Sequence, residues 1–277
     1  MNELSYSTGG VIGVIGVPAP AGERAARRGR LTELGAMLRR SLRLTLRNVD
    51  GLLTALVLPV MLMVMFVYFF GGAINVGGRY IDYVVPGVLL VCVGFSAGTT
   101  AVSVSADLAA GIIDRFRSLD VHPSTLLAGH VAASLVRNLA SAALAVGVAF
   151  AIGYRSGAGA GQWLAAAGLL ILFVIAFSWL AAAIGVVTRS PEAAQGITFL
   201  IAFLPYPSSA FVPIHTMPSW LQGFARNQPV TAVIDSLRAL LSGHAPGAAA
   251  WHAVAWSLGI AGVSVVVAGW LFARRMR

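Results

Sequence analysis

Few residues in this chain have the types and spacing that catalysis or cofactor binding requires. All 19 basic residues are arginine, and lysine is absent. A P-loop needs a lysine to reach the β- and γ-phosphates of ATP, so the sequence excludes a standard ATP site. The single cysteine, Cys92, excludes an internal disulfide and a cysteine-cluster metal site. We therefore expect neither ATP hydrolysis nor redox chemistry in this chain.

The histidines and the acidic residues are scattered rather than clustered. None of the five histidines has another histidine or a carboxylate three or four residues further on, so we expect no metal site. The ten acidic residues lie outside the long uncharged runs of the chain. Because proton-coupled pumps depend on acids within the membrane, this distribution disfavours a secondary transporter. The histidines are His122, His130, His215, His244 and His252.

One group of polar side chains lies within an otherwise apolar run. Ser96, Thr99, Thr100 and Ser103 recur at helical spacing and share one predicted helix face. They could line a transport pathway, or serve as the small residues at which membrane helices pack. Arg137 likewise allows two interpretations, as a substrate-binding residue or as a side chain that snorkels to lipid phosphates.

The elements that must position these residues are membrane helices. The 277 residues are 58% hydrophobic and only 10% charged, which is far less charge than soluble domains carry. A helix needs roughly 20 apolar residues to cross a bilayer, and the uncharged runs lack the alternation of a barrel strand. We therefore predict an all-α integral membrane fold with six transmembrane helices. They are expected near residues 52–70, 83–105, 126–154, 163–188, 193–217 and 254–273.

The arginines predict the orientation and the peripheral regions. With both termini in the cytoplasm, most arginines fall on the inner side, as the positive-inside rule requires. Residues 1–30 read as a disordered cytoplasmic tail. Residues 31–50 read as an interfacial amphipathic helix, with a coiled-coil or partner helix as the alternative. Residues 51–277 form the six-span domain. The net charge of +9 then indicates membrane-surface anchoring rather than nucleic-acid binding.

The segment between the fifth and sixth spans contains too many prolines for one helix. We predict a short helix around Trp220 and a second from about Val230 to Leu241, closed by Gly243. Both read as re-entrant or interfacial, so this segment is a candidate outer gate. Trp220 and Phe224 could equally be plain interface anchors. The gate candidates are Pro213, Pro218, Trp220, Phe224, Asn227 and Pro229.

The segment that follows Asp107 reads as a short amphipathic helix on the cytoplasmic side. Ile112, Phe116 and Leu119 recur at helical spacing beside charged residues. Such a helix can dock in a groove of a partner and transmit its movement. It could instead lie on the lipid surface.

Several of these segments resemble type 2 ATP-binding-cassette permeases, and among them the daunorubicin-resistance type of actinobacterial exporter permeases. The similarity is carried by Leu58 and Pro59, by residues 80–87 and 107–125, and by the outer run from Pro213 to Arg238. Asp120 departs from the family pattern, in which a proline is expected. The resemblance implies that the segment from Asp107 onward couples the permease to an ATPase. Its coupling residues would be Asp107, Gly111, Ile112, Asp114, Arg115, Phe116, Arg117 and Leu119.

The sequence and the resemblance together predict a permease subunit, not an enzyme, in the plasma membrane. We expect it to pair with itself or a sister permease and with two copies of a cytoplasmic ATPase, which would bind ATP and Mg²⁺. The expected substrate is an amphipathic or hydrophobic drug, natural product or lipid-like molecule that leaves the cytoplasm. An ion-coupled secondary transporter and a membrane-embedded lipid enzyme are the alternatives.

Overall fold

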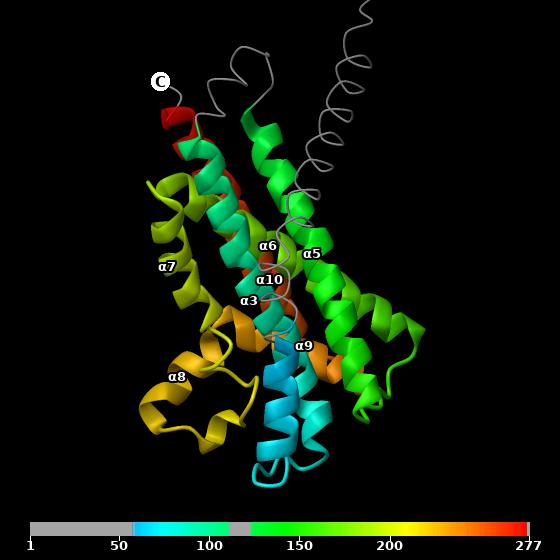
Figure 1. The fold of residues 1–277 in the computed structure, drawn as a ribbon. Coiled ribbons are helices and arrows are strands. Elements are labelled where there is room, and N and C mark those ends of the chain that lie inside the picture. Colours follow the sequence, from blue (N-terminus) through cyan, green and yellow to red (C-terminus); the bar gives the residue numbers. More distant parts are fainter. Residues whose placement is uncertain (1–56, 58, 111–122, 276–277) are drawn as a thin grey trace, which may run out of the picture.

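The computed structural model describes residues 57, 59–110 and 123–275, and the regular structure within them is helical (Figure 1). Short turns join most successive helices. The elements are the π-helix η1 (Phe66–Phe70), α3 (Tyr80–Ala109), α5 (Pro123–Ala151), α6 (Ala160–Val187), α7 (Pro191–Ala202), the 3-10 helix η2 (Ile214–Thr216), α8 (Ser219–Asn227), α9 (Pro229–Leu241) and α10 (Gly247–Arg275).

Four helices in the described part of the chain are long and apolar enough to cross a membrane. They cover Tyr80–Ala109, Leu126–Ala151, Ala160–Val187 and Gly247–Phe272. By length and composition, these helices agree with the predicted second, third, fourth and sixth spans. Of the first predicted span, the described residues include the apolar helix Pro59–Phe70.

The fifth predicted span is much shorter than the sequence suggested. Helix α7 begins at Pro191, close to the predicted start at residue 193. Ser190 caps it by accepting a hydrogen bond from the Ala193 backbone N–H at 3.2 Å, and Pro191 follows in the first turn. The prediction of a span over residues 193–217 was wrong about its length, because α7 ends at Ala202 after 12 residues. A helix of that length rises only about 18 Å, which is less than the roughly 30 Å of a bilayer core. Pro205 and Pro207 lie in the turns that follow and prevent the helix from continuing.

Helix α3 lies at the centre of the bundle. It packs against α5, α6, α7 and α9 (Figure 1). Most of its side chains are buried. Glycines permit two of the closest approaches. A Cβ atom on Gly87 would lie 2.7 Å from the carbonyl oxygen of Ala210, and one on Gly185 of α6 would lie 2.5 Å from that of Ala101. Both glycines therefore stand where a larger residue would separate packed elements.

The two short helices predicted in the outer segment are both present. Helix α9 begins with Pro229 at its first position, and Gly243 follows its end with a φ of +83°. The positive φ favours glycine, and the carbonyl oxygen of Gly157 lies close to it, so little space remains for a side chain. Pro218 is the N-cap of α8. These helices lie at the opposite end of the bundle from the carboxyl terminus (Figure 1).

Several predictions fall outside the described residues. These are the tail of residues 1–30, the interfacial helix of residues 31–50, the beginning of the first span, and most of the coupling segment.

Candidate functional site

Polar side chains gather at three levels of the bundle. The first group lies toward the end of the bundle opposite the carboxyl terminus, and it joins α9 to α3. Arg238 of α9 donates to the Asp235 carboxylate at 2.8 Å, and its guanidinium lies 3.8 Å from the centre of the Tyr83 ring. Ser209 donates to the same carboxylate at 2.6 Å and accepts a bond from Arg238 through its backbone carbonyl. Burial lowers the pKa of the Arg238 guanidinium, while Tyr83 and Asp235 act in the opposite direction. This ion pair fixes the turns after α7 between two helices.

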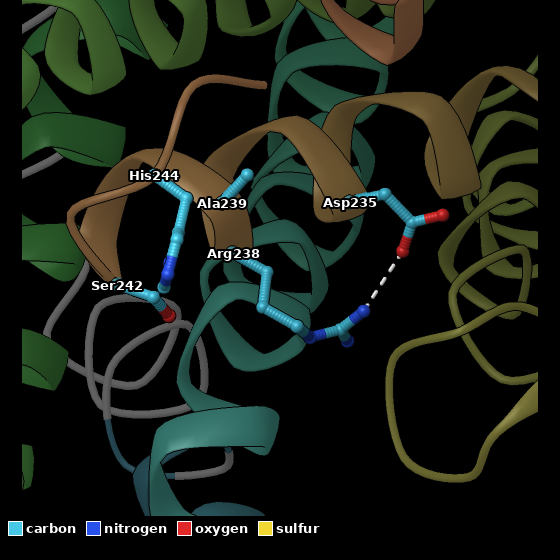
Figure 2. A pocket seen from close by; sticks show the side chains of 5 residues that line it. All are labelled: Asp235, Arg238, Ala239, Ser242 and His244. Atoms are coloured by element: carbon cyan, nitrogen blue, oxygen red, sulfur yellow. Dashed lines mark hydrogen bonds and ion pairs between the residues drawn. The ribbon is translucent and has the colours of Figure 1, made fainter. Parts of the chain in front are cut away.

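An open hollow of about 440 Å³ lies beside this ion pair. Figure 2 shows Arg238 between its partner Asp235 and the side chains of Ser242 and His244, and Ala239 completes the lining. The guanidinium of Arg238 points toward Asp235, so its charge is compensated within the chain. The hollow therefore offers a mixed polar and apolar surface rather than a strongly charged one.

The second group lies inside the membrane-spanning part, around Arg137 of α5. This side chain is only 8% exposed. Its Nε donates to the Ser96 hydroxyl at 3.0 Å, and its Nη2 donates to the Thr100 hydroxyl at 2.7 Å. The interpretation of Arg137 as a residue that snorkels to lipid phosphates was wrong. The guanidinium faces α3, because hydroxyl acceptors are available there at membrane depth.

Neighbouring amide and hydroxyl groups extend this second group to α6. Asn138 donates to the Ser96 hydroxyl at 2.9 Å and to the Ser134 carbonyl at 2.9 Å. Ser178 of α6 donates to the Ser134 hydroxyl at 2.8 Å. Within the described part of the chain, the buried Oδ1 of Asn138 has no hydrogen-bond partner. The group therefore joins three spanning helices through side chains.

The four hydroxyl residues singled out as a possible pathway separate into two pairs. Ser96 and Thr100 are buried against Arg137, as helix-packing residues would be. Thr99 is half-buried and Ser103 is exposed, and each donates to a carbonyl of its own helix. A place for the four residues in a transport pathway stays a prediction. Of the four, Thr99 and Ser103 are the better candidates, because only these two have exposed surface.

The third group is a pair at the end of the bundle where α3 ends and α5 begins. Nε2 of His130 lies 3.0 Å from Oδ2 of Asp107, and both side chains are largely buried. Asp107 has a further interaction beyond this pair. The pair thus bridges the two helices on either side of residues 111–122.

Comparison of the sequence with known protein families identifies the family of this chain. The model of the family described as ABC-2 type transporter matches residues 32–241, which is most of the chain. The chain belongs to the ABC-2 type transporter family. This assignment confirms the resemblance predicted from its motifs.

Curated relatives of this ABC-2 chain are permeases named for drug resistance. The chain is 30% identical to the daunorubicin resistance ABC transporter permease protein DrrB1 of Streptomyces coeruleorubidus, over 86% of the chain and 85% of that protein. It is 24% identical to the probable doxorubicin resistance ABC transporter permease protein DrrC of Mycobacterium tuberculosis, over 79% of the chain and 80% of that protein. Members of this family are permease components of ABC transporters rather than enzymes.

The predicted outer-gate residues of the permease do not line the hollow. Trp220 and Phe224 lie one turn apart on α8 with 78% and 53% of their surface exposed. Pro213 precedes η2, and Asn227 ends α8 with its amide bonded to the Gly223 carbonyl. Their role in a gate stays a prediction. An exposed aromatic pair of this kind is also what interface anchoring requires.

Of the predicted coupling residues, the structure describes Asp107. Gly111, Ile112, Asp114, Arg115, Phe116, Arg117 and Leu119 lie outside the described residues. Sequence reasoning missed His130 as the partner of Asp107, and it missed the pairing of Asp235 with Arg238. The latter pair carried a signal, because an acid three residues before an arginine on a helix is a favourable spacing. The partner of Asp107 is 23 residues away, beyond the reach of any local rule.

Proposed function

We propose that this chain is the membrane-spanning subunit of an ATP-driven exporter that moves an amphipathic or hydrophobic molecule out of the cytoplasm. Membership of the ABC-2 family supports this proposal most directly, together with relatives named for resistance to daunorubicin and doxorubicin. Because these 277 residues contain no lysine, they cannot form a standard P-loop. ATP and Mg²⁺ would therefore be bound by an ATPase outside this permease region, which we expect to be a separate polypeptide. Two ATPase copies and a second permease, identical or related, would complete the transporter.

The arrangement of the helices supports a cytoplasmic position for residues 111–122. The end of α3, the beginning of α5 and the carboxyl terminus lie at the same end of the bundle (Figure 1). Arg274 and Arg275 are at this end, and arginines near membrane ends favour the cytoplasmic side. An ATPase docked there would act on α3 and α5, which carry the second and third polar groups, whereas α8 and α9 would lie at the outer end of the bundle.

Purification from the native membrane tests the partner. The tagged chain, extracted in mild detergent, should bring with it a subunit with vanadate-sensitive ATPase activity. Phe116→Ala combined with Arg117→Ala should weaken this association or uncouple hydrolysis from transport, without loss of membrane insertion. The matched control is Trp220→Ala on the opposite end of the bundle, which should leave the association unchanged. Isolation of the chain without any ATPase would refute the proposal.

Transport by the purified complex tests the direction and the substrate class. Reconstituted in vesicles with ATP outside, the complex should accumulate daunorubicin or doxorubicin in the lumen, and vanadate should stop this uptake. Uptake that needs a proton gradient and no ATP would instead favour a secondary transporter.

A further inference from the structure

The second and third polar groups lie along the same pair of helices, α3 and α5, at two levels. On α5, His130, Ser134, Arg137 and Asn138 follow one another at spacings of four, three and one residues, so they share a helix face. On α3, the residues that meet them share a face as well. We call this set the polar seam, and its members are Ser96, Thr100 and Asp107 of α3 with His130, Ser134, Arg137 and Asn138 of α5.

We propose that the polar seam fastens α3 and α5 into one rigid body, so that movement imposed at residues 111–122 reaches the middle of the membrane. His130 and Arg137 are its positioning residues, because each bonds across the two helices at its own level, and Asn138 adds a bond to Ser96 at the level of Arg137. This inference rests on the proposed function as an ATP-driven permease. It assigns a role to residues of α3 and α5 that lie away from the predicted outer gate.

The hydrogen bonds of the polar seam explain why α3 and α5 would not move along each other. A displacement of one helix along the other would separate the guanidinium of Arg137 from the hydroxyls of Ser96 and Thr100. In a membrane no water is available to replace such partners, so buried polar groups resist separation. The seam also reaches α6 through the bond from Ser178 to Ser134, which adds a third helix to the body.

The other side of α3 differs in this respect. Gly94 faces Ala202 of α7, and a Cβ on Gly94 would lie 3.5 Å from the Cβ of Ala202. Among the described residues, no side-chain hydrogen bond joins α3 to α7. The side chains of Gln195 and Thr198 on α7 also pack against Gly98 of α3. Because no side-chain hydrogen bond joins the two helices, none must break when one helix moves along the other. We therefore place the moving surface at α3 and α7, and the fixed one at α3 and α5.

The first test changes His130 in the complete complex with its ATPase, reconstituted in vesicles with daunorubicin as the probe. His130→Ala should lower transport per ATP hydrolysed by about fivefold or more, a typical size for coupling between sites, while the complex still assembles and hydrolyses ATP. His130→Gln should restore coupling, because its amide can donate to Asp107 in place of the imidazole. Val136→Ala, on the exposed face of the same helix, is the matched control and should leave the ratio unchanged.

These outcomes separate a coupling role from a structural one and from failure of the proposed function. A merely structural residue would lower the amount of assembled complex and leave the ratio of transport to hydrolysis unchanged, and that result would overturn the inference. If the unaltered complex shows no ATP-dependent transport, the proposed function fails instead. Arg137→Gln should show the same uncoupling as His130→Ala; an Arg137→Gln complex that assembles and stays fully coupled would also overturn the inference.

A disulfide between α3 and α7 provides the second test. In a Cys92→Ala background, the pair Gly94→Cys and Ala202→Cys places two Cβ atoms about 3.5 Å apart, within the range that a disulfide spans. Oxidation should stop transport, and reduction should restore it, because α7 could no longer move along α3. The Gly94→Cys single variant controls for the added side chain. Undiminished transport by the oxidised pair would show that α3 and α7 do not move relative to each other, and would overturn the inference.

Discussion

Helices α3 and α10 are alike in length and mean hydropathy, yet they have opposite places in the molecule. In the most apolar window of each, 78% of the α3 residues are buried inside the chain, against 17% for α10. Helix α3 packs against four other helices, whereas α10 packs mainly against α6 and α9 and leaves much of its surface exposed. Hydropathy therefore identifies a membrane helix but does not tell which of its faces meets protein.

The difference lies in the kind of residue rather than in the total apolarity. Helix α3 carries glycines at close contacts and hydroxyl groups that bond to α5, so protein can approach its backbone from several sides. Helix α10 carries exposed tryptophans at 251, 256 and 270, which suit a surface that meets lipid and its headgroups. Its glycines at 259, 262 and 269 have open space where a Cβ would be.

The largest expected effect comes from removing a leucine at matched positions of the two helices. Leu90 of α3 is 1% exposed and Leu258 of α10 is 56% exposed. Leu90→Ala should lower the free energy of unfolding by about 2–3 kcal/mol, because the cavity is not refilled, while Leu258→Ala should change it by less than about 0.5 kcal/mol. Unfolding of the detergent-purified protein, followed by circular dichroism, measures both. Equal effects would mean that the exposed face of α10 is packed against protein after all.

A smaller effect is expected from adding a methyl group to a glycine. Gly185→Ala forces a Cβ to within 2.5 Å of the Ala101 carbonyl oxygen on α3, so α6 must shift. We expect a loss of about 1–2 kcal/mol, typical of overpacking. Gly262→Ala in α10 has open space and should be neutral or stabilising by up to about 1 kcal/mol, because alanine is the better helix former.

Thermal melting of the two variants in the same detergent checks the opposite signs. If Gly185→Ala melts at the temperature of the unaltered protein, the close contact between α6 and α3 is not a determinant of stability. A destabilised Gly262→Ala would indicate a contact on α10 that the single chain does not have.

The spans whose apolar runs were uninterrupted could be predicted from the sequence, and so could the local signals at helix ends. The cap at Ser190, the first-turn Pro229 and the positive-φ Gly243 after α9 are short-range features that depend on a few neighbouring residues. The length of α7 could not be inferred from apolarity, because the residues after Ala202 are apolar too and only Pro205 and Pro207 distinguish them.

The polar seam was beyond sequence reasoning for a different reason. Arg137 is a residue whose behaviour depends on what stands opposite, and its partners on α3 are 37 and 41 residues away. At equal depth, an arginine that meets lipid extends toward the headgroups, whereas one that meets hydroxyls turns inward. The stripe that contains Ser96 and Thr100 was visible in the sequence, but nothing local paired it with α5.

The smallest effect concerns an interaction that α10 makes with itself. The guanidinium of Arg274 lies 3.8 Å from the centre of the Trp270 ring, near the end of the helix where the carboxyl terminus emerges. A double-mutant cycle of Trp270→Leu and Arg274→Gln should give a coupling of about 0.5–1 kcal/mol, as exposed cation–π pairs do. The same cycle with Trp251→Leu, at the opposite end of α10, should give none. A coupling near zero for the first pair would show that this contact does not stabilise the end of α10, in contrast to α3, whose side chains bond to a neighbouring helix.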